Sequence, residues 1–480
     1  MTLRVTNVLR REKEDFTPIT PGKVSMYVCG PTVYDNSHLG HAKTYVSFDL
    51  IVRYLRFSGY DVLYVQNLTD VGHLLDTGED RILKKARQAS ALPMQIVETY
   101  ARSYFQDMDS LGVTRPDISP RASGHIPEQI EMIQKLIDKG HAYESDGSVY
   151  FDVASWPSYG KLSNRRVEEQ ESGTRRLEGD GKHNPEDFAL WKRAEVEHIL
   201  QWNSPWGVGY PGWHIECSAM SSKYLGATFD IHGGGIDNIF PHNECEIAQS
   251  EAANDAPFAN YWLLVGSLTV GGQKMSKSLG NFVTIKDALV RYRPEVIRTF
   301  IFQSHYSNPI DYSDEALMGA QKGWERLMTA VRLTRSQLAN AADSKVGAEF
   351  KSVLDEHRQK FIEAMDDDFN APIALATLQN LTGEVNKLLN GPDKVGKPTL
   401  EAIHRTYAVL GREILGIIPT HESQSSDSRR ESGLIELLIA LRNQAREQKQ
   451  YATSDVIRDQ LKGLGVTLED RADGTIYRLD

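Results

Sequence analysis

The stretch Val24-Ser-Met-Tyr-Val-Cys29-Gly-Pro-Thr-Val-Tyr-Asp-Asn-Ser-His38-Leu-Gly-His41 opens the part of the chain that decides its fold. Residues 24–29 form a short apolar run typical of a buried strand. Apolar side chains then recur at helical spacing from about residue 40 to residue 56, and residues 61–66 form a second strand-like run. A strand, a loop, a helix and a strand in this order predict a parallel βαβ unit and hence an α/β fold.

Two motifs in this framework are candidates for binding a nucleotide. His38 and His41 are predicted to lie at the N-terminus of the helix, where backbone N–H groups and the helix dipole favour an anion. The second motif is Lys274-Met-Ser-Lys277-Ser278, in which flanking glycines allow a loop to close on pyrophosphate. Activation of a carboxylate by ATP requires the α-phosphate to be held in line and the charge on the triphosphate to be stabilised. The catalytic candidates are therefore His38, His41, Lys274 and Lys277, and the candidates for ATP binding are Gly40, Lys274, Lys277 and Ser278.

Each motif alone has a simpler interpretation. The histidines could cap the helix or lie on the surface, and the lysine motif could be a solvated turn. Both motifs together, in this order around a βαβ pattern, favour the nucleotide site.

Composition narrows the class of protein. The chain has 480 residues, of which 40% are hydrophobic and 25% charged, as in an ordinary globular protein of two to four domains. The N-terminal residues have no apolar signal-peptide region, and no run is long enough to cross a bilayer. Three cysteines argue against a disulfide framework, so we expect a cytoplasmic protein. The net charge of −11 disfavours non-specific binding to DNA, although local basic patches could still contact one folded RNA.

The organisation of the chain follows from changes in its pattern. Residues 125–200 are predicted to be an insertion in the nucleotide fold, and the core pattern resumes with Gly209-Tyr-Pro-Gly-Trp-His-Ile-Glu-Cys. Residues 233–237 are interpreted as a glycine-rich loop that lets the backbone approach a ligand. Long helical periodicity follows from residue 316, and a polar break separates a final small piece. The predicted domains are 1–124 and 201–315 for the two halves of the catalytic domain, 125–200 for the insertion, 316–420 for a helical bundle and 421–480 for a small C-terminal domain.

Several motifs together resemble cysteinyl-tRNA synthetases, which belong to class I of the aminoacyl-tRNA synthetases. They are CGPTVYD, HLGH, NLTD, PGWHIECS, the GGG-I-D segment, FPHNECEIAQ and KMSKS, and they cover most of the first 300 residues. As a set they are highly specific. The resemblance implies a Rossmann-like parallel-sheet catalytic domain that activates L-cysteine with ATP and Mg²⁺ to cysteinyl-adenylate. It also implies a helical bundle and a C-terminal domain that bind tRNA(Cys).

A metal site is predicted from three residues at the ends or starts of elements of one sheet, Cys29, Cys217 and His242. Thiolates with an imidazole suit Zn²⁺. Spacing alone favours Cys245 as the fourth ligand, whereas the resemblance assigns Glu246, one helical turn after His242. The alternative is that the cysteines are unrelated and buried. A Zn²⁺ ion that binds the substrate thiolate in preference to the hydroxyl of serine would remove the need for an editing site.

The resemblance also places the cysteine pocket, which would be completed by Thr69, Trp213, His214 and Asp237. Asp237 is the expected partner of the substrate ammonium group. Trp213 could also be a core aromatic residue, but its place in PGWHIECS favours the pocket.

The acceptor of the activated cysteine is predicted from chain length. An alternative enzyme joins cysteine to the amine of a glucosaminyl-inositol, as in mycothiol synthesis, and another alternative is an inactive RNA-binding paralogue. About 160 residues after the catalytic region favour the synthetase, and the intact His38, His41, Lys274 and Lys277 argue against an inactive paralogue. Near the C-terminus Arg442, Arg446, Lys449 and Arg458 recur on a helical pattern, so that contact with RNA and a solvated amphipathic face are both possible. We expect a monomer that binds tRNA(Cys), L-cysteine and ATP and has no membrane partner.

Overall fold

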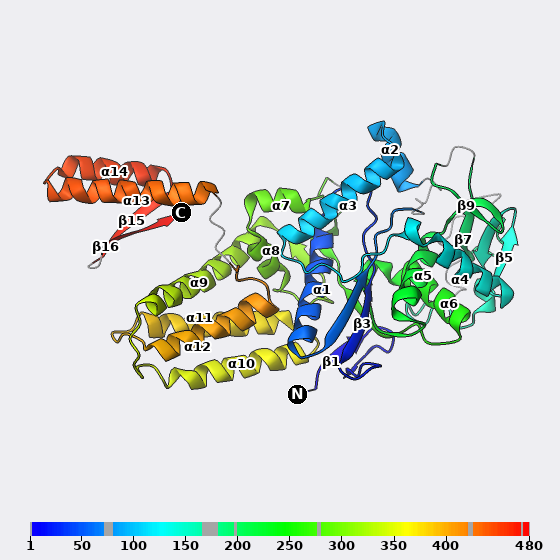
Figure 1. The fold of residues 1–480 in the computed structure, drawn as a ribbon, viewed down its shortest axis with the longest axis horizontal. Coiled ribbons are helices and arrows are strands. Elements are labelled where there is room, and N and C mark those ends of the chain that lie inside the picture. The colour runs from blue at the N-terminus through cyan, green and yellow to red at the C-terminus, as the bar shows by residue number, and fades with distance from the viewer. Residues whose placement is uncertain are drawn as a thin grey trace. The chain divides into compact units, whose positions relative to one another are not determined.

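The computed structural model describes residues 2–71, 80–165, 181–195, 199–275, 280–420, 426–471 and 474–479. The chain forms two compact units, residues 1–418 and residues 419–480 (Figure 1). Lys277 and Ser278 lie outside the described residues. Within the described part, no helix is long and apolar enough to cross a membrane.

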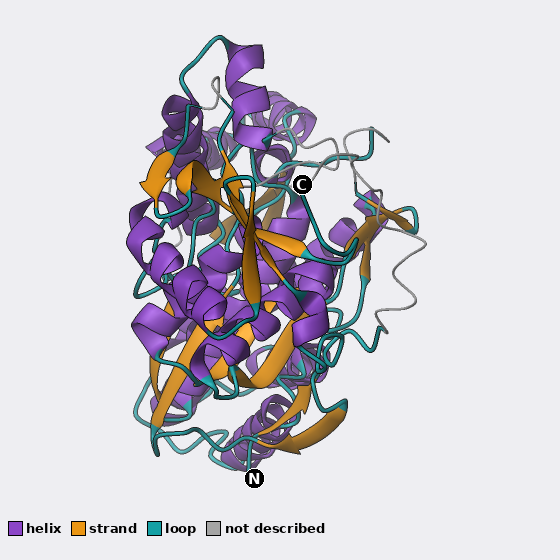
Figure 2. Cartoon of the chain, turned by 90° about the vertical axis from the view of Figure 1, so that its right-hand side faces the viewer, coloured by secondary structure: helices purple, strands orange, loops and turns teal. Residues whose placement is uncertain are grey.

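A four-stranded parallel sheet forms the centre of the first unit, in the order β11-β10-β3-β4. Its strands are β3 (Lys23–Val28), β4 (Asp61–Gln66), β10 (Phe229–Gly235) and β11 (Ala259–Val265). β3 and β4 are joined through helix α1 (Leu39–Phe57), which confirms the predicted βαβ unit and the α/β fold class. The sheet is surrounded by helices, as a parallel sheet requires (Figure 2).

Helix α1 is specified by its own sequence. His38 is the N-cap: its Nδ1 accepts a hydrogen bond from the backbone N–H of Gly40 at 3.0 Å, and the His41 side chain accepts one from the backbone N–H of His38 at 3.2 Å. This reciprocal pair is a capping box made of two histidines. Apolar side chains at helical spacing, including Val46, Leu50 and Leu55, are buried. The helix therefore begins at the histidine motif because that motif supplies its cap.

The glycine-rich segment 233–237 is not a loop at its start, so that prediction was wrong. Gly233 to Gly235 complete strand β10, where they pair with β11, and Gly233 also pairs with β3. A Cβ atom on Gly233 would lie 2.3 Å from Cζ of Phe48 on α1. The glycine is therefore required by close packing between helix and sheet, and only Ile236 and Asp237 continue beyond the strand.

The predicted insertion, together with residues 202–211, forms a second sheet with its own core. Its antiparallel order is β5-β6-β7-β9-β8, and its buried side chains include Phe151, Leu190 and Trp191. The strands are β5 (Ala142–Ser145), β6 (Ser148–Phe151), β7 (Phe188–Arg193), β8 (Trp202–Ser204) and β9 (Gly207–Pro211). The helices α4 (Ile126–Asp138), α5 (Trp213–Leu225) and α6 (Glu244–Asn254) contribute to the same core. The helices α2 (Arg81–Ala89) and α3 (Pro93–Ser110) contribute to the core of the parallel sheet instead. Short turns of helix lie at Ala122–His125, Val153–Ser155, Ile236–Asn238 and Ile239–Asn243.

A small three-stranded sheet carries the first lysine of the lysine motif. Its order is β13-β12-β14, with β13 antiparallel and β14 parallel to β12. The strands are β12 (Leu268–Val270), β13 (Gln273–Lys274) and β14 (Ile310–Tyr312), and the helices α7 (Ile285–Arg291) and α8 (Pro294–Ile301) lie between β13 and β14 in the chain. The N-terminal hairpin consists of β1 (Arg4–Asn7) and β2 (Glu12–Asp15).

Helices make up the rest of the first unit, as predicted from the sequence. They are α9 (Asp314–Ala339), α10 (Phe350–Asp366), α11 (Ala371–Leu389), α12 (Lys397–Tyr407) and a last turn at Ala408–Ile414. A buried arginine joins them to α1: Arg298 of α8 lies 2.7 Å from Asp49 of α1 and also donates to the carbonyl of Leu415 at 2.8 Å.

The second unit contains α13 (Ser426–Glu447), α14 (Tyr451–Gly463) and the hairpin β15 (Val466–Arg471) and β16 (Gly474–Leu479). Arg442 is buried and donates two hydrogen bonds to the carboxylate of Asp470, each 2.8 Å long, and Arg446 donates a third. Arg442 therefore lies on neither a solvated face nor a free RNA-binding surface. It joins the helical hairpin to β15.

Candidate functional site

The site is built where the strands of the parallel sheet end. The loop after β3 lies beside the loop after β4, because Gly30 N–H donates to Oδ1 of Asn67 at 2.7 Å and Thr69 N–H donates to the carbonyl of Pro31 at 3.1 Å. A Cβ atom on Gly30 would overlap the carbonyl oxygen of Asn67 at 1.6 Å. This glycine therefore allows the two loops that carry Cys29 and Thr69 to approach each other.

The histidine pair lies at the N-terminus of α1 and is uncharged. The ring centroids of His38 and His41 are 3.9 Å apart. Burial, and to a smaller extent the Lys274 ammonium group, lower the pKa of His38 to about 4. Burial also lowers the pKa of His41, helped by His38. Since Nδ1 of each ring accepts a backbone hydrogen bond, Nε2 carries the proton and is left as a donor.

Lys274 and Asp237 are brought together by the tertiary structure. The Lys274 Nζ lies 2.9 Å from Oδ1 of Asp237, and both side chains are more than half exposed, at 66% and 54%. The sequence predicted these residues for different substrates, Lys274 for phosphate and Asp237 for an ammonium group. In this structure the two side chains therefore neutralise each other's charge.

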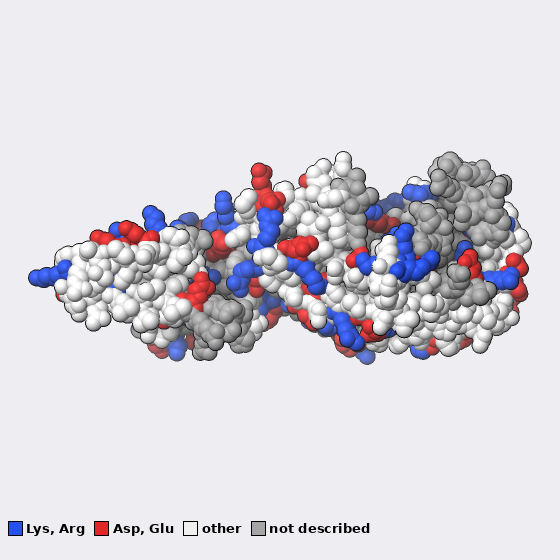
Figure 3. All heavy atoms as spheres, turned by 90° about the horizontal axis from the view of Figure 1, so that it is seen from above, with Lys and Arg blue, Asp and Glu red and all other residues white. Residues whose placement is uncertain are grey.

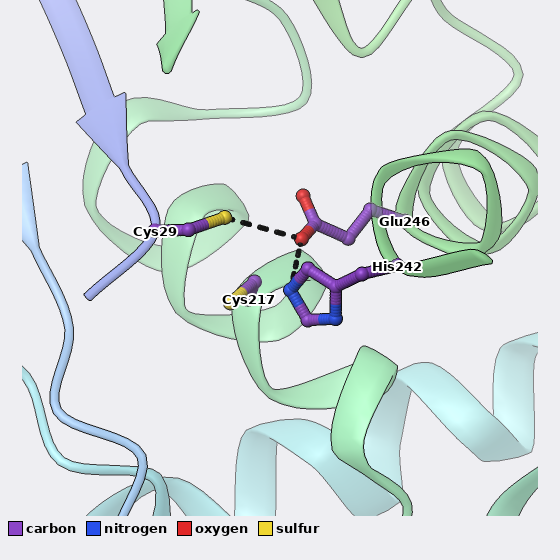
Figure 4. A group of neighbouring side chains, drawn as sticks. All are labelled: Cys29, Cys217, His242 and Glu246. Carbon is purple, nitrogen blue, oxygen red and sulfur yellow. Dashed lines mark hydrogen bonds and ion pairs between the residues drawn. The ribbon is translucent and has the colours of Figure 1, made fainter. Parts of the chain in front are cut away.

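Four side chains from distant parts of the chain converge on one point. Ligand atoms of Cys29, Cys217, His242 and Glu246 all lie within 4.8 Å of one another, and all four residues are buried (Figure 4). Cys29 follows β3, Cys217 lies in α5, His242 lies just before α6, and Glu246 lies in the first turn of α6. The Glu246 carboxylate lies 2.6 Å from Nε2 of His242 and 3.4 Å from the sulfur of Cys29.

The charges of this group suit a bound cation. The hydrogen bond from the Cys29 thiol lowers the pKa of Cys217 to about 6, against the effect of burial. Burial alone would raise the pKa of Glu246, but His232 and His242 hold it below its ordinary value. Burial likewise would lower the pKa of His242, but Glu246 and Cys217 raise it to about 10. Two buried anions thus share a protonated imidazole, and a metal cation could replace that proton.

A second histidine, His232 of β10, orients the Glu246 carboxylate by binding the oxygen opposite to the one that His242 contacts. Its Nε2 hydrogen-bonds to Oε2 of Glu246, and its ring stacks on Trp262 with centroids 4.1 Å apart. An imidazole that orients a ligating carboxylate is the usual support of a metal centre. Sequence reasoning missed His232, because a histidine inside a buried strand gives no local signal of its partner.

The predicted cysteine pocket adjoins the four-residue group through Trp213 and His214, at the start of α5. The Trp213 ring lies 4.4 Å from the His242 ring, and Nδ1 of His214 lies 2.9 Å from Nδ1 of His242. Thr69 is buried at the end of β4, and its hydroxyl accepts a hydrogen bond from Asn67 at 3.2 Å.

Cys245, the ligand favoured by spacing, points elsewhere. It is fully buried in the core of the insertion, and its sulfur lies 3.4 Å from the hydroxyl of Tyr159. Burial raises its pKa, so that it is held as a neutral thiol. Glu246 rather than Cys245 therefore completes the group.

The face of the molecule shown in Figure 3 carries interspersed acidic and basic side chains over its described residues. This mixture agrees with the net charge of −11. A uniform basic field does not cover that face, so any contact with RNA there would rest on local groups.

Comparisons with known proteins show what the chain as a whole is similar to. The family described as "tRNA synthetases class I (C) catalytic domain" matches residues 15–322, and the "DALR domain" family matches residues 360–419. The chain is 50% identical over 488 residues to the cysteine--tRNA ligase of Chlorobium luteolum, covering 99% of each chain. It is also 50% identical to that of Deinococcus radiodurans, covering 98% of this chain and 96% of the other.

Solved structures are similar in fold. Methionyl-tRNA synthetase of Mycobacterium tuberculosis bound by methionyl-adenylate matches with a TM-score of 0.60 at 16% identity, over 82% of this chain and 92% of the other. Agrobacterium radiobacter LeuRS, in a ternary complex with tRNA and LeuAMS, matches with a TM-score of 0.61 at 12% identity, over 84% and 85% of the chains.

Proposed function

Because this chain belongs to the cysteine--tRNA ligase family of class I aminoacyl-tRNA synthetases, we propose an assignment of its side chains to the steps of that reaction. The chain is an enzyme that uses ATP to join cysteine to tRNA. The observation that carries the assignment is the convergence of Cys29, Cys217, His242 and Glu246 within 4.8 Å, at the sheet edge where α1 also begins. Activation of cysteine requires a group that recognises a thiol beside a group that holds a phosphate.

Phosphate binding is assigned to the N-terminus of α1 and to the lysine motif. The neutral His38 and His41 each have an Nε2–H group free to donate to phosphate oxygens, as judged from their backbone hydrogen bonds. The backbone near Gly40 and the helix dipole add to this attraction. Lys274, together with Lys277 and Ser278, would stabilise charge on the leaving pyrophosphate, with Mg²⁺ bound to the triphosphate.

Recognition of the substrate side chain is assigned to a zinc site made by Cys29, Cys217, His242 and Glu246. Two thiols, an imidazole and a carboxylate are the donors that Zn²⁺ prefers, and the buried negative charge of the group favours a cation. When bound, Zn²⁺ would accept the substrate thiolate in preference to the hydroxyl of serine, which does not ionise at neutral pH. His232 would hold Glu246 in position.

The rest of the cysteine molecule is assigned to the neighbouring pocket residues. Trp213 and His214 contact His242 and would border the side chain, and Thr69 lies at the end of the adjacent strand. Asp237 would bind the ammonium group, which requires it to exchange its present partner Lys274.

Transfer of cysteine to the terminal ribose hydroxyl of tRNA(Cys) is assigned to the same sheet edge. Residues 316–420 and 421–480 would bind the tRNA, and the match of the DALR family to residues 360–419 supports this role for the first of them. Relatives 50% identical over almost the whole chain favour tRNA over an aminosugar-inositol acceptor and over an inactive paralogue. The monomeric state, the cytoplasmic location and the domain boundaries stay predictions.

The experiment that tests the function is ATP-dependent charging of total tRNA with labelled cysteine, in the presence of excess serine. We expect an alkali-labile cysteinyl ester whose yield does not change with serine. A labelled small amine instead of labelled tRNA would support the alternative ligase.

The zinc assignment is tested by a matched pair of cysteine variants. Cys217→Ser should lose the bound zinc, measured by elemental analysis, together with cysteine-dependent ATP–pyrophosphate exchange. Cys245→Ser should retain both, because that thiol lies in the core of the insertion. Loss of zinc from Cys245→Ser, with zinc retained by Glu246→Gln, would contradict the assignment.

A further inference from the structure

Lys43 is a buried lysine that the proposed reaction does not use. It lies on α1, two residues after His41, and its residue exposure is 1%. Its Nζ donates to the backbone carbonyl of Ser267 at 3.3 Å and to that of Asn308. Among the ion pairs of the described residues, none pairs a carboxylate with Lys43. Its two hydrogen-bond acceptors are therefore both main-chain oxygens.

The two carbonyls belong to the sheet that carries Lys274. Ser267 immediately precedes β12, Asn308 lies two residues before β14, and these two strands are parallel neighbours. The same edge is tightly joined, since Ile310 N–H donates to the carbonyl of Ser267 at 3.0 Å and Gly266 N–H donates to that of Tyr306 at 2.9 Å. β12 in turn pairs Thr269 with Lys274 of β13. Lys43 thus holds the start of the sheet whose outer strand ends at Lys274.

The chain that leaves the lysine motif is tied to the same helix. Leu39 N–H donates to the carbonyl of Val283 at 3.1 Å, and Ile285 N–H donates to that of Ser37 at 2.9 Å. The chain segments before and after the lysine motif are therefore both hydrogen-bonded to the start of α1. Within α1, Leu39 and Lys43 are four residues apart, so these two attachment points are separated by about 6 Å along the helix, at 1.5 Å per residue.

Burial of an ammonium group without a carboxylate is costly, and it lowers the pKa of Lys43 to about 8. An apolar side chain would fill the same space without that cost, but it would remove the Nζ hydrogen bond to the Asn308 carbonyl and leave the Ser267 carbonyl with the Ile310 N–H as its donor. One long side chain with several N–H donors can join two separate strands to one helix.

We propose that Lys43 is a positioning residue for the activation step: it fixes the sheet that carries Lys274 relative to the helix that carries His38 and His41. This inference rests on the proposed function, because it assumes that Lys274 and the histidines act on the same ATP. A shift of about 1 Å between such groups can reduce a rate about 100-fold.

The test compares Lys43→Met with Lys43→Arg in cysteine-dependent ATP–pyrophosphate exchange. We expect the methionine variant to lose roughly 10- to 100-fold in kcat while its equilibrium affinity for cysteine changes less than about twofold. The arginine variant retains donors and should recover most of the rate. The control is Arg53→Met on the same helix, which also donates to backbone carbonyls but lies away from both motifs, and which should lower only thermal stability.

A double-mutant cycle separates positioning from a general structural role. If Lys43 acts through Lys274, Lys43→Met should reduce the rate less than about threefold further in a Lys274→Met background. A full multiplicative loss in that background, or an unchanged kcat in Lys43→Met with only a lower melting temperature, would overturn the inference. Absence of exchange in the unmodified chain would instead refute the proposed function.

Discussion

Gly233→Ala is a sharp test of how the sheet and helix α1 fit together. The new Cβ atom would lie 2.3 Å from Cζ and 2.4 Å from Cε1 of Phe48, well inside van der Waals contact. Phe48 is fully buried, and β10 is hydrogen-bonded to a strand on each side, so neither partner can move into free space. The strain must therefore be absorbed by the core itself.

The size of the effect follows from two opposing contributions. Overpacking of this kind costs about 1–3 kcal/mol, and the severity of the overlap places Gly233→Ala at the upper end. Replacing glycine by alanine also restricts the unfolded chain, which stabilises the fold by about 0.4–1 kcal/mol. We expect a net loss of roughly 2 kcal/mol.

Gly235→Ala is a matched control in the same strand. Its Cβ atom would meet nothing closer than Oγ1 of Thr44 at 3.9 Å, and its φ of −74° is accessible to alanine. We therefore expect this variant to be neutral or more stable by a few tenths of a kcal/mol.

Urea unfolding followed by tryptophan fluorescence measures the difference. All seven tryptophans lie within residues 1–418, so the signal reports on the first unit alone. Phe48→Leu removes Cζ and Cε1 and should relieve the overlap, which gives a coupling of about 1–2 kcal/mol between the two substitutions. Equal stability of Gly233→Ala and Gly235→Ala, or additive effects with Phe48→Leu, would refute the packing argument.

Three further perturbations address charged groups. The pKa of His38 in the folded chain is about 4, below its ordinary 6.5, so the unfolded chain binds a proton more readily and stability is lost as pH falls from 6.5 to 4. At about 1.4 kcal/mol for each tenfold difference in proton affinity, the unfolding free energy should fall by roughly 2–3 kcal/mol more than in His38→Asn, which retains a helix cap. Urea unfolding at each pH measures this difference. Lys274→Met should leave Asp237 without its lysine partner and so tighten cysteine binding up to about fivefold, measured by equilibrium dialysis. Weaker cysteine binding in this variant would mean that the ion pair does not compete with the substrate. Arg298→Met should destabilise the first unit by about 3–5 kcal/mol, because it leaves the buried Asp49 with Arg53 as its remaining basic partner. Adding Asp49→Asn should restore part of that loss in the double variant. A loss below about 1 kcal/mol in Arg298→Met would contradict this reasoning.

The sequence was sufficient for features that depend on neighbouring residues. The βαβ unit could be predicted because strand and helix periodicities are local, and the start of α1 because His38 and His41 cap it themselves. The thiol and imidazole groups could be chosen as candidates by type, since their chemistry does not depend on the fold, whereas Glu246 was assigned by the family resemblance. The segment 233–237 was misread as a loop because the requirement for Gly233 comes from Phe48, which lies far away in sequence.

Only the tertiary structure could decide which of these groups meet. Spacing favoured Cys245 and resemblance favoured Glu246, but adjacent residues on a helix point about 100° apart, so the rotation of α6 in its packing determines which one faces Cys29. The pairing of Lys274 with Asp237 and the burial of Lys43 likewise join segments far apart in the chain. Local periodicity determines where a side chain lies on its own helix or strand. Burial and the order of the strands determine which neighbouring element that side chain faces, because the packing energy is shared by the whole core.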